Sequence, residues 1–203
     1  MLLQYMKELL KSQGYKFLTL KMNRIHTPMK QVMMRLNYSG LIELDKCNVL
    51  EMFGFFGLWH TKDYVKYVKH IDFFEIDKKI IRYAKLGFRN DNVDFYCGDS
   101  IQYIGNTDKK YDLVIADSPI CLDVYDKETG IPNFLGDMFR VSAENGALIF
   151  NIKTKHLTKY KKIREKIQLT STKEVKDIFF VVRNKKITYV VVALGASLCN
   201  KQE

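Results

Sequence analysis

The chain has 203 residues, of which 47% are hydrophobic and 13% aromatic, enough for one packed domain with a small appendage. No apolar run reaches the roughly 18 residues that a membrane span needs, and residues 1–16 indicate an amphipathic helix rather than a signal peptide. The formal charge of +10 favours a polyanionic partner, although the excess of lysine over arginine also arises from composition bias alone. The four cysteines are far apart and form no CxxC pair, which indicates reduced thiols and a cytoplasmic location.

The first 45 residues are predicted to form a helical N-terminal extension, and residues 46–203 to form the main domain. Apolar residues recur at helical spacing from Leu2 to Leu10. A second helix is predicted to begin with Thr27 as its N-cap and Pro28 at its first position. Its apolar stripe would consist of Met29, Val32, Met33 and Leu36.

From Cys47 onward, short apolar runs alternate with helical patterns. Strands are predicted over 47–52, 70–76, 93–98, 111–117 and 146–152, with helices over 61–69, 78–86, from Ser100, 133–141 and 157–167. This alternation predicts an α/β fold with a doubly wound, mostly parallel sheet. The last segment, 176–195, contains two strands around a turn at 183–186, which indicates an antiparallel hairpin.

Acidic residues follow each of the first four predicted strands. In an open parallel sheet, ligands bind beyond the carboxyl ends of the strands, and buried charges there need a partner. One adenosine-bearing ligand accounts for all of these acids. Glu75 can accept both ribose hydroxyls, and Asp99 with its adjoining backbone can meet the adenine amine. We expect Gly54 and Gly57 to let the backbone approach this ligand closely.

Four segments at these strand ends, "VLEMFGFFG", "DFFEID", "CGDS" and "YDLVIADSP", together resemble the motifs of class I S-adenosylmethionine-dependent methyltransferases, over about residues 47–194. The resemblance implies an enzyme with a Rossmann-like fold and S-adenosylmethionine as its cofactor, without a metal. Phe55 stands where that family usually has a glycine, so its side chain must point away from the cofactor, or the pocket is altered. The implied cofactor-binding residues are Glu51, Met52, Phe53, Gly54, Gly57, Glu75, Ile76, Asp77, Gly98, Asp99, Ser100 and Asp117.

The residues after the fourth strand would face the transferred methyl group. Asp117, Ser118 and Pro119 partly match the D/N-P-P-aromatic motif of methyltransferases that act on exocyclic base amines, and they are the candidate catalytic residues. In those enzymes the first side chain and a backbone carbonyl accept the hydrogens of the amine. Ile120 replaces the aromatic residue that stacks on the base, so Tyr125 or Phe134 would have to substitute for it.

A base amine in RNA, rather than DNA, is the leading acceptor. The segment "KTKHLTKYKKIREK" follows the fifth strand, so Lys153 and Lys155 could bind a phosphate backbone, although a solvated helix face explains the same pattern. The small size and the helical extension also resemble compact ribosomal RNA base methyltransferases.

Several alternatives stay open. A small metabolite could be the acceptor of O- or N-methylation, with Asp117, Asp123 and Asn151 as ligands of a metal ion. Aminopropyl transferases share the fold and a similar Asp-Ser pair, but the chain offers no room for their usual extra domain. A catalytically inactive binding subunit would tolerate Phe55. A nicotinamide enzyme is disfavoured because the loop lacks a full G-x-G-x-x-G. His60 is expected at the surface or at a helix start.

Overall fold

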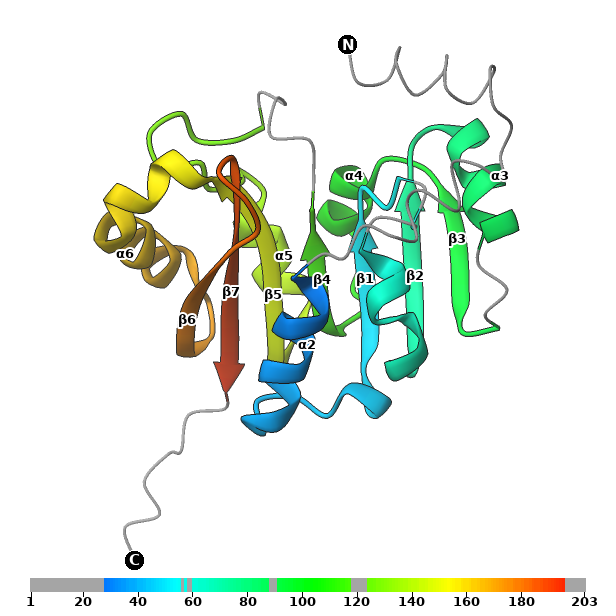
Figure 1. Cartoon of the computed structure of the whole chain (residues 1–203), viewed down its shortest axis with the longest axis horizontal. Coiled ribbons are helices and arrows are strands. Elements are labelled where there is room, and N and C mark those ends of the chain that lie inside the picture. Colours follow the sequence, from blue (N-terminus) through cyan, green and yellow to red (C-terminus); the bar gives the residue numbers. More distant parts are fainter. Residues whose placement is uncertain (1–27, 56, 58–59, 88–90, 118–123, 196–203) are drawn as a thin grey trace, which may run out of the picture.

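One mixed sheet organises the computed structural model, which describes residues 28–55, 57, 60–87, 91–117 and 124–195. Its seven strands lie in the order β3-β2-β1-β4-β5-β7-β6 (Figure 1). The strands are β1 (Asn48–Met52), β2 (His70–Glu75), β3 (Val93–Cys97), β4 (Tyr111–Ala116), β5 (Ser142–Lys153), β6 (Glu174–Val182) and β7 (Ile187–Gly195). The helices are α2 (Met29–Tyr38), α3 (Lys78–Gly87), α4 (Ser100–Asn106), α5 (Leu135–Val141) and α6 (Tyr160–Thr170), with short 3₁₀ turns η1 (Leu44–Lys46), η2 (Thr61–Asp63), η3 (Val65–Tyr67) and η4 (Thr154–Lys159).

The strand pairing confirms the expected doubly wound, Rossmann-like sheet. Strands β1 to β5 pair in parallel, whereas β7 pairs antiparallel with both β5 and β6. The terminal hairpin is therefore the expected one, and β7 lies between β5 and β6. The chain winds outward in both directions from β1 and β4, so the carboxyl ends of these two strands form the switch point where such folds bind ligands.

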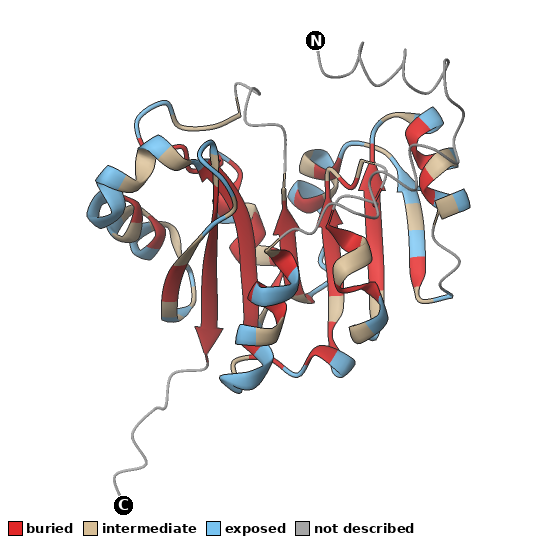
Figure 2. Cartoon of the chain, in the orientation of Figure 1, coloured by how far each residue is buried: buried red, intermediate tan, exposed pale blue. Residues whose placement is uncertain are grey.

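Two hydrophobic cores cover the two faces of the sheet. The helix α2 lies over the central strands on one face, while α4, α5 and α6 pack on the other (Figure 1). The four residues of the predicted α2 stripe are fully buried, and Pro28 is the N-cap rather than the first helical residue. Thr27 lies outside the described residues. Figure 2 shows the central strands buried along their length, while the edge strand β3 keeps exposed positions.

The helix predicted over 61–69 is wrong. The structure forms the two 3₁₀ turns η2 and η3 there. In a 3₁₀ helix, side chains three residues apart eclipse one another. Thr61 and Tyr64 have this spacing, and both donate hydrogen bonds to the buried Glu51. A tertiary contact therefore sets the local geometry. Among the described residues, no helix is long and apolar enough to cross a membrane.

Candidate active site

The predicted residues Glu51 and Asp117 lie side by side at the switch point. Met52 at the end of β1 pairs in register with Ala116 at the end of β4, which brings both carboxylates to adjacent strand ends. Both side chains are removed from solvent, with exposures of 0% for Glu51 and 5% for Asp117. Buried carboxylates at this density require cationic or hydrogen-bonding partners.

His60 provides the cation between them. Its Nε2 lies 2.9 Å from Glu51 Oε1, and its Nδ1 lies 3.1 Å from Asp117 Oδ2. Neither N–H points well enough at its oxygen to form an aligned hydrogen bond, so both contacts are ion pairs. His60 stands at a helix start, as expected, because it is the N-cap of η2, but the expectation of a surface position is wrong, since its side chain is 3% exposed. The two facing carboxylates offset the cost of burying it.

The C-terminal hairpin completes the surroundings of Asp117. Arg183, at the turn between β6 and β7, places NH1 3.1 Å from Asp117 Oδ2, and the Tyr189 hydroxyl donates to the same oxygen at 2.9 Å. Asn151 of β5 donates its amide to Oδ1 at 2.8 Å. Asn151 of β5, Tyr189 of β7 and the adjoining turn thus hold the carboxylate in addition to His60. We call Glu51, His60, Asp117 and Arg183 the buried charge cluster.

The protonation states in this cluster follow from burial and charge. Burial alone would lower the pKa of His60, but Glu51 and Asp117 outweigh it and raise that pKa to about 10. Burial would raise the pKa of Asp117, but His60, Arg183 and Tyr189 hold it below its usual value. At neutral pH Asp117 is therefore ionised and His60 is protonated, and the formal charges of the four residues of the cluster sum to zero.

The predicted ribose acid, Glu75, ends β2 and is 9% exposed. Its Oε2 accepts the Phe55 N–H at 2.9 Å, and its Oε1 accepts the Asp77 N–H at 3.0 Å. The loop after β1 is thus tied to the carboxylate through the backbone. Each oxygen of a carboxylate has two lone pairs, so both can still accept a ribose hydroxyl.

The loop itself adopts an unusual backbone. Phe53 and Phe55 have φ angles of 57° and 52°, in the left-handed region that non-glycine residues seldom occupy. Such conformations cost about 1–3 kcal/mol each and persist where the surrounding structure over-determines them. The hydrogen bond from Phe55 to Glu75 is one such constraint. Gly57, with φ 65°, has the residue type suited to this region.

The structure gives Gly54 a packing role. A β-carbon at this position would lie 2.3 Å from the Phe73 ring, so only glycine fits between the loop and β2. The Gly54 N–H also donates to the Phe74 carbonyl at 2.8 Å. Gly54 therefore allows the loop to pack closely against β2. Its close approach to a ligand remains a prediction.

The predicted adenine residues lie at the start of α4. Asp99 is the N-cap of this helix, and its Oδ1 accepts the Ile101 N–H at 2.8 Å. Gly98 connects to the ribose acid through its N–H, which donates to the Glu75 carbonyl. An open groove of about 470 Å³ runs along α4 from Gly98 and Asp99 toward Thr107. Only its rim reaches the strand ends, so the groove is not centred on the candidate site.

The remaining predicted cofactor residues are placed around these groups. Asp77 caps α3, since its Oδ1 accepts the Lys79 N–H at 2.8 Å. Ile76 is 69% exposed directly after the ribose acid, where an apolar side chain can cover a base. Met52 is fully buried in the core, and Ser100 is buried at the first position of α4.

Two of the three candidate catalytic residues, Ser118 and Pro119, lie outside the described residues, as does Asp123. The proposed metal site on Asp117 and Asn151 fits poorly, because His60 and Arg183 already place positive charge against Asp117. The candidate aromatic Phe134 is buried against Phe53, with ring centroids 6.0 Å apart. Tyr125 meets the edge of the Phe134 ring at 6.4 Å.

The basic segment divides into two parts. Lys153 and Lys155, at the carboxyl end of β5, are exposed. Further along, Lys162 donates to Glu128 Oε1 at 2.9 Å, and Lys166 lies 3.1 Å from Asp126 Oδ2. Lys162 and Lys166 of α6 therefore pair with the segment that follows β4, and the predicted phosphate contacts stay with Lys153 and Lys155.

The sequence indicates the two carboxylates of the buried charge cluster but not its two cations. His60 is not expected in the interior, and Arg183 lies in the predicted turn at 183–186. Two polar groups could have indicated the cluster: Asn151 interrupts the apolar run at 147–152, and Tyr189 carries a hydroxyl beside the apolar run at 190–194. Both turn out to bond Asp117.

Solved structures with a similar fold include methyltransferases. The human methyltransferase-like protein 13 in complex with SAH has a TM-score of 0.59 at 16% identity, covering 87% of this chain and 85% of that one. The N-methyltransferase NodS from Bradyrhizobium japonicum has a TM-score of 0.55 at 14% identity, covering 82% and 94%. The M. jannaschii tRNA m1G37 methyltransferase has a TM-score of 0.55 at 16% identity, covering 83% and 49%. At these identities the likeness concerns the fold.

Comparison of sequences points to a different group of proteins from the methyltransferases. A polyamine aminopropyltransferase of Methanocaldococcus jannaschii is 36% identical over 61 residues, which make up 27% of this chain and 21% of that protein. The chain thus matches about a fifth of that relative's length. The spermine/spermidine synthase domain matches residues 45–199, which include every strand and the buried charge cluster. The chain therefore belongs to the spermine/spermidine synthase domain family.

Proposed function

We propose that the chain is a transferase that binds an adenosyl-sulfonium ligand of the S-adenosylmethionine type and moves an alkyl group from its sulfur to an amine. The observation that supports this most is the row of acids at the carboxyl ends of adjacent parallel strands: Glu51, Glu75, Asp99 and Asp117. Glu75 and Asp99 lie outside the neutral buried charge cluster, and in a chain with a formal charge of +10 their carboxylates suit a cationic sulfonium ligand.

The chemistry requires little from the protein beyond positioning. The carbon–sulfur bond breaks as the carbon–nitrogen bond forms, the sulfonium becomes a neutral thioether, and the amine gives up a proton. Holding both reactants in line supplies most of the acceleration. Glu75 would hold the ribose. Asp117 Oδ1, which accepts one hydrogen bond from Asn151 among the described residues, would accept another from the amine or the ligand tail. Because its pKa is lowered, Asp117 suits hydrogen bonding better than proton removal.

The first candidate is transfer of an aminopropyl group from decarboxylated S-adenosylmethionine to a polyamine. Membership of the spermine/spermidine synthase domain family and the matched segment of an aminopropyltransferase support it. The tail of that donor ends in an ammonium group, which Glu51 or Asp117 would bind.

The second candidate is methyl transfer from S-adenosylmethionine to a base amine in RNA. The neutrality of the buried charge cluster favours it. A methionine tail carries an ammonium and a carboxylate, so it adds no net charge, and His60 or Arg183 could pair with the carboxylate. A decarboxylated tail would add an uncompensated positive charge unless His60 released its proton. The exposed Lys153 and Lys155 would contact the RNA backbone.

The by-product distinguishes the two candidates. The purified chain is incubated with decarboxylated S-adenosylmethionine and a diamine, and separately with S-adenosylmethionine and bulk RNA, and the thioether is identified by mass spectrometry. Methylthioadenosine would support aminopropyl transfer, whereas S-adenosylhomocysteine would support methyl transfer. Glu75→Ala serves as the control, because it should abolish either product. Ligand binding without either product would favour a binding subunit and contradict the proposed transfer.

A further inference from the structure

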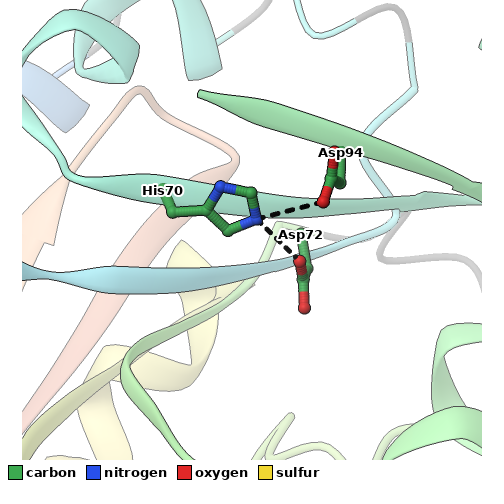
Figure 3. A group of neighbouring side chains, drawn as sticks. All are labelled: His70, Asp72 and Asp94. Atoms are coloured by element: carbon green, nitrogen blue, oxygen red, sulfur yellow. Dashed lines mark hydrogen bonds and ion pairs between the residues drawn. The ribbon is translucent and has the colours of Figure 1, made fainter. Parts of the chain in front are cut away.

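A second polar cluster lies at the opposite end of β2 from the ribose acid. It consists of His70 and Asp72 on β2 and Asp94 on β3 (Figure 3). Asp72 pairs in register with Asp94 on the adjacent parallel strand. His70 precedes Asp72 by two residues and so shares its face of the sheet. Five strand steps separate His70 from Glu75, which is about 16 Å, so this cluster is distinct from the candidate active site.

The three side chains converge on one small volume. His70 Nε2 lies 3.1 Å from Asp72 Oδ1 and 3.5 Å from Asp94 Oδ2, and all three potential ligand atoms lie within 4.8 Å of one another. Ligand atoms about 2.0–2.1 Å from a tetrahedral zinc ion are roughly 3.3 Å from one another. The two separations from His70 Nε2 to the aspartate oxygens are close to this ligand–ligand distance. Figure 3 shows the imidazole directed at both carboxylates.

Asp72 is held in place from behind. Its side chain is 1% exposed, and its Oδ2 accepts hydrogen bonds from Lys109 Nζ and from the Tyr111 hydroxyl, both at 2.5 Å. The Tyr103 hydroxyl in turn bonds Tyr111 at 2.8 Å. Ligating carboxylates in metal sites are commonly fixed by such outer hydrogen bonds. This arrangement leaves Oδ1 directed at His70.

We propose that His70, Asp72 and Asp94 form a binding site for a divalent transition-metal ion of the zinc type. One imidazole and two carboxylates are ligands that zinc accepts, whereas Mg²⁺ and Ca²⁺ prefer sites made only of oxygen. Asp72, Asp94 and Lys109 together leave one net negative charge for the cation. The exposure of Asp94, 62%, and of His70, 29%, gives the ion an entry path and a water ligand.

The consequence for the fold is a link between β2 and the edge strand β3. β3 is less buried than the neighbouring strands β2 and β1, and Asp94 is among its exposed positions. A metal ion bound across the two strands would stabilise this edge and, through it, the positions of Glu75 and Gly98 at the other end.

The test measures zinc binding to the chelator-treated full chain by competition with a chromophoric chelator, together with thermal unfolding. We expect Asp94→Asn to weaken zinc binding by about tenfold or more and to remove the zinc-induced rise in melting temperature. Asp94 is exposed, so this variant should fold. Asp108→Asn, which changes a fully exposed carboxylate outside the cluster, should bind zinc like the unchanged chain.

Lys109→Gln provides an independent check. Glutamine can still donate a hydrogen bond to Asp72, but it removes a positive charge that repels the metal ion, so zinc should bind severalfold more tightly. Equal zinc affinity of the unchanged chain and Asp94→Asn, or unchanged or weaker binding by Lys109→Gln, would overturn the proposal. His70 would then be an ordinary ion-pair partner of the two aspartates.

Discussion

Replacing His60 with leucine should destabilise the fold more than any other single histidine change among the described residues. The leucine fills much of the same volume but removes the only cation of the cluster beside Glu51 and leaves Asp117 paired with Arg183 alone. A pKa raised from 6.5 to about 10 corresponds to about 4 kcal/mol of folding free energy at pH 7. Breaking buried ion pairs typically costs about 3–5 kcal/mol, which agrees with this figure.

The loss of stability caused by His60→Leu should depend on pH. Because the folded-state pKa of His60 lies above the unfolded one, its contribution is complete below about pH 6.5 and is lost as the pH rises toward 10. The stability difference between the unchanged chain and His60→Leu should therefore be about 4 kcal/mol near pH 7 and shrink steadily toward pH 10.

Urea unfolding at pH 6.5, 8 and 9.5 measures this difference. His156→Leu is the matched control, since His156 is partly exposed, donates one hydrogen bond from Nδ1 to the Glu128 carbonyl, and has a pKa that burial lowers. The His156→Leu substitution should lower the free energy of unfolding by about 1 kcal/mol, and this difference from the unchanged chain should not shrink at high pH. A loss of less than 1 kcal/mol for His60→Leu, or a difference that stays constant with pH, would refute the charged His60 bridge.

Three further predictions concern the loop, the ribose acid and the basic segment. Gly54→Ala should lower the free energy of unfolding by about 2–3 kcal/mol in thermal unfolding, because the added β-carbon overlaps the buried Phe73 ring. The control Gly105→Ala lies in open space within α4 and should stabilise the fold by about 0.5–1 kcal/mol. Equal effects of the two substitutions would contradict the packing role of Gly54. Glu75→Ala should weaken adenosyl-ligand binding by about 100-fold in calorimetry through loss of two charge-assisted hydrogen bonds, and unchanged affinity would exclude the ribose assignment. Replacing both Lys153 and Lys155 should weaken RNA binding and reduce its salt slope by about 1.5, unlike replacement of two ion-paired lysines of α6.

The mostly parallel sheet and its terminal hairpin could be predicted from the sequence because each strand combines an apolar run with a clear boundary. The strands from 47 onward and the terminal hairpin appear as expected, and the α2 stripe is buried as expected. The failed helix at 61–69 has a different cause. Its residues also satisfy helical spacing, but the bonds from Thr61 and Tyr64 to Glu51 select 3₁₀ geometry. Local pattern does not contain that tertiary contact.

The candidate site was predictable only in part. Acids that follow strands are visible in the sequence, so Glu51, Glu75 and Asp117 were found. Their partners were not, because Arg183 is 66 positions along the chain from Asp117 and only the pairing of β5, β6 and β7 brings it there. The His70 cluster was missed for the same reason, since strand register alone places Asp94 beside Asp72.

The central claim is that the carboxyl ends of β1 to β4 bind an adenosyl-sulfonium ligand. Isothermal titration of the full chain with S-adenosylmethionine, its decarboxylated form and S-adenosylhomocysteine tests it most directly, with NAD as the negative control. The account predicts micromolar binding of at least one of the three adenosyl ligands and its loss in Glu75→Ala. Absence of binding for all three, or equal binding by Glu75→Ala, would contradict it.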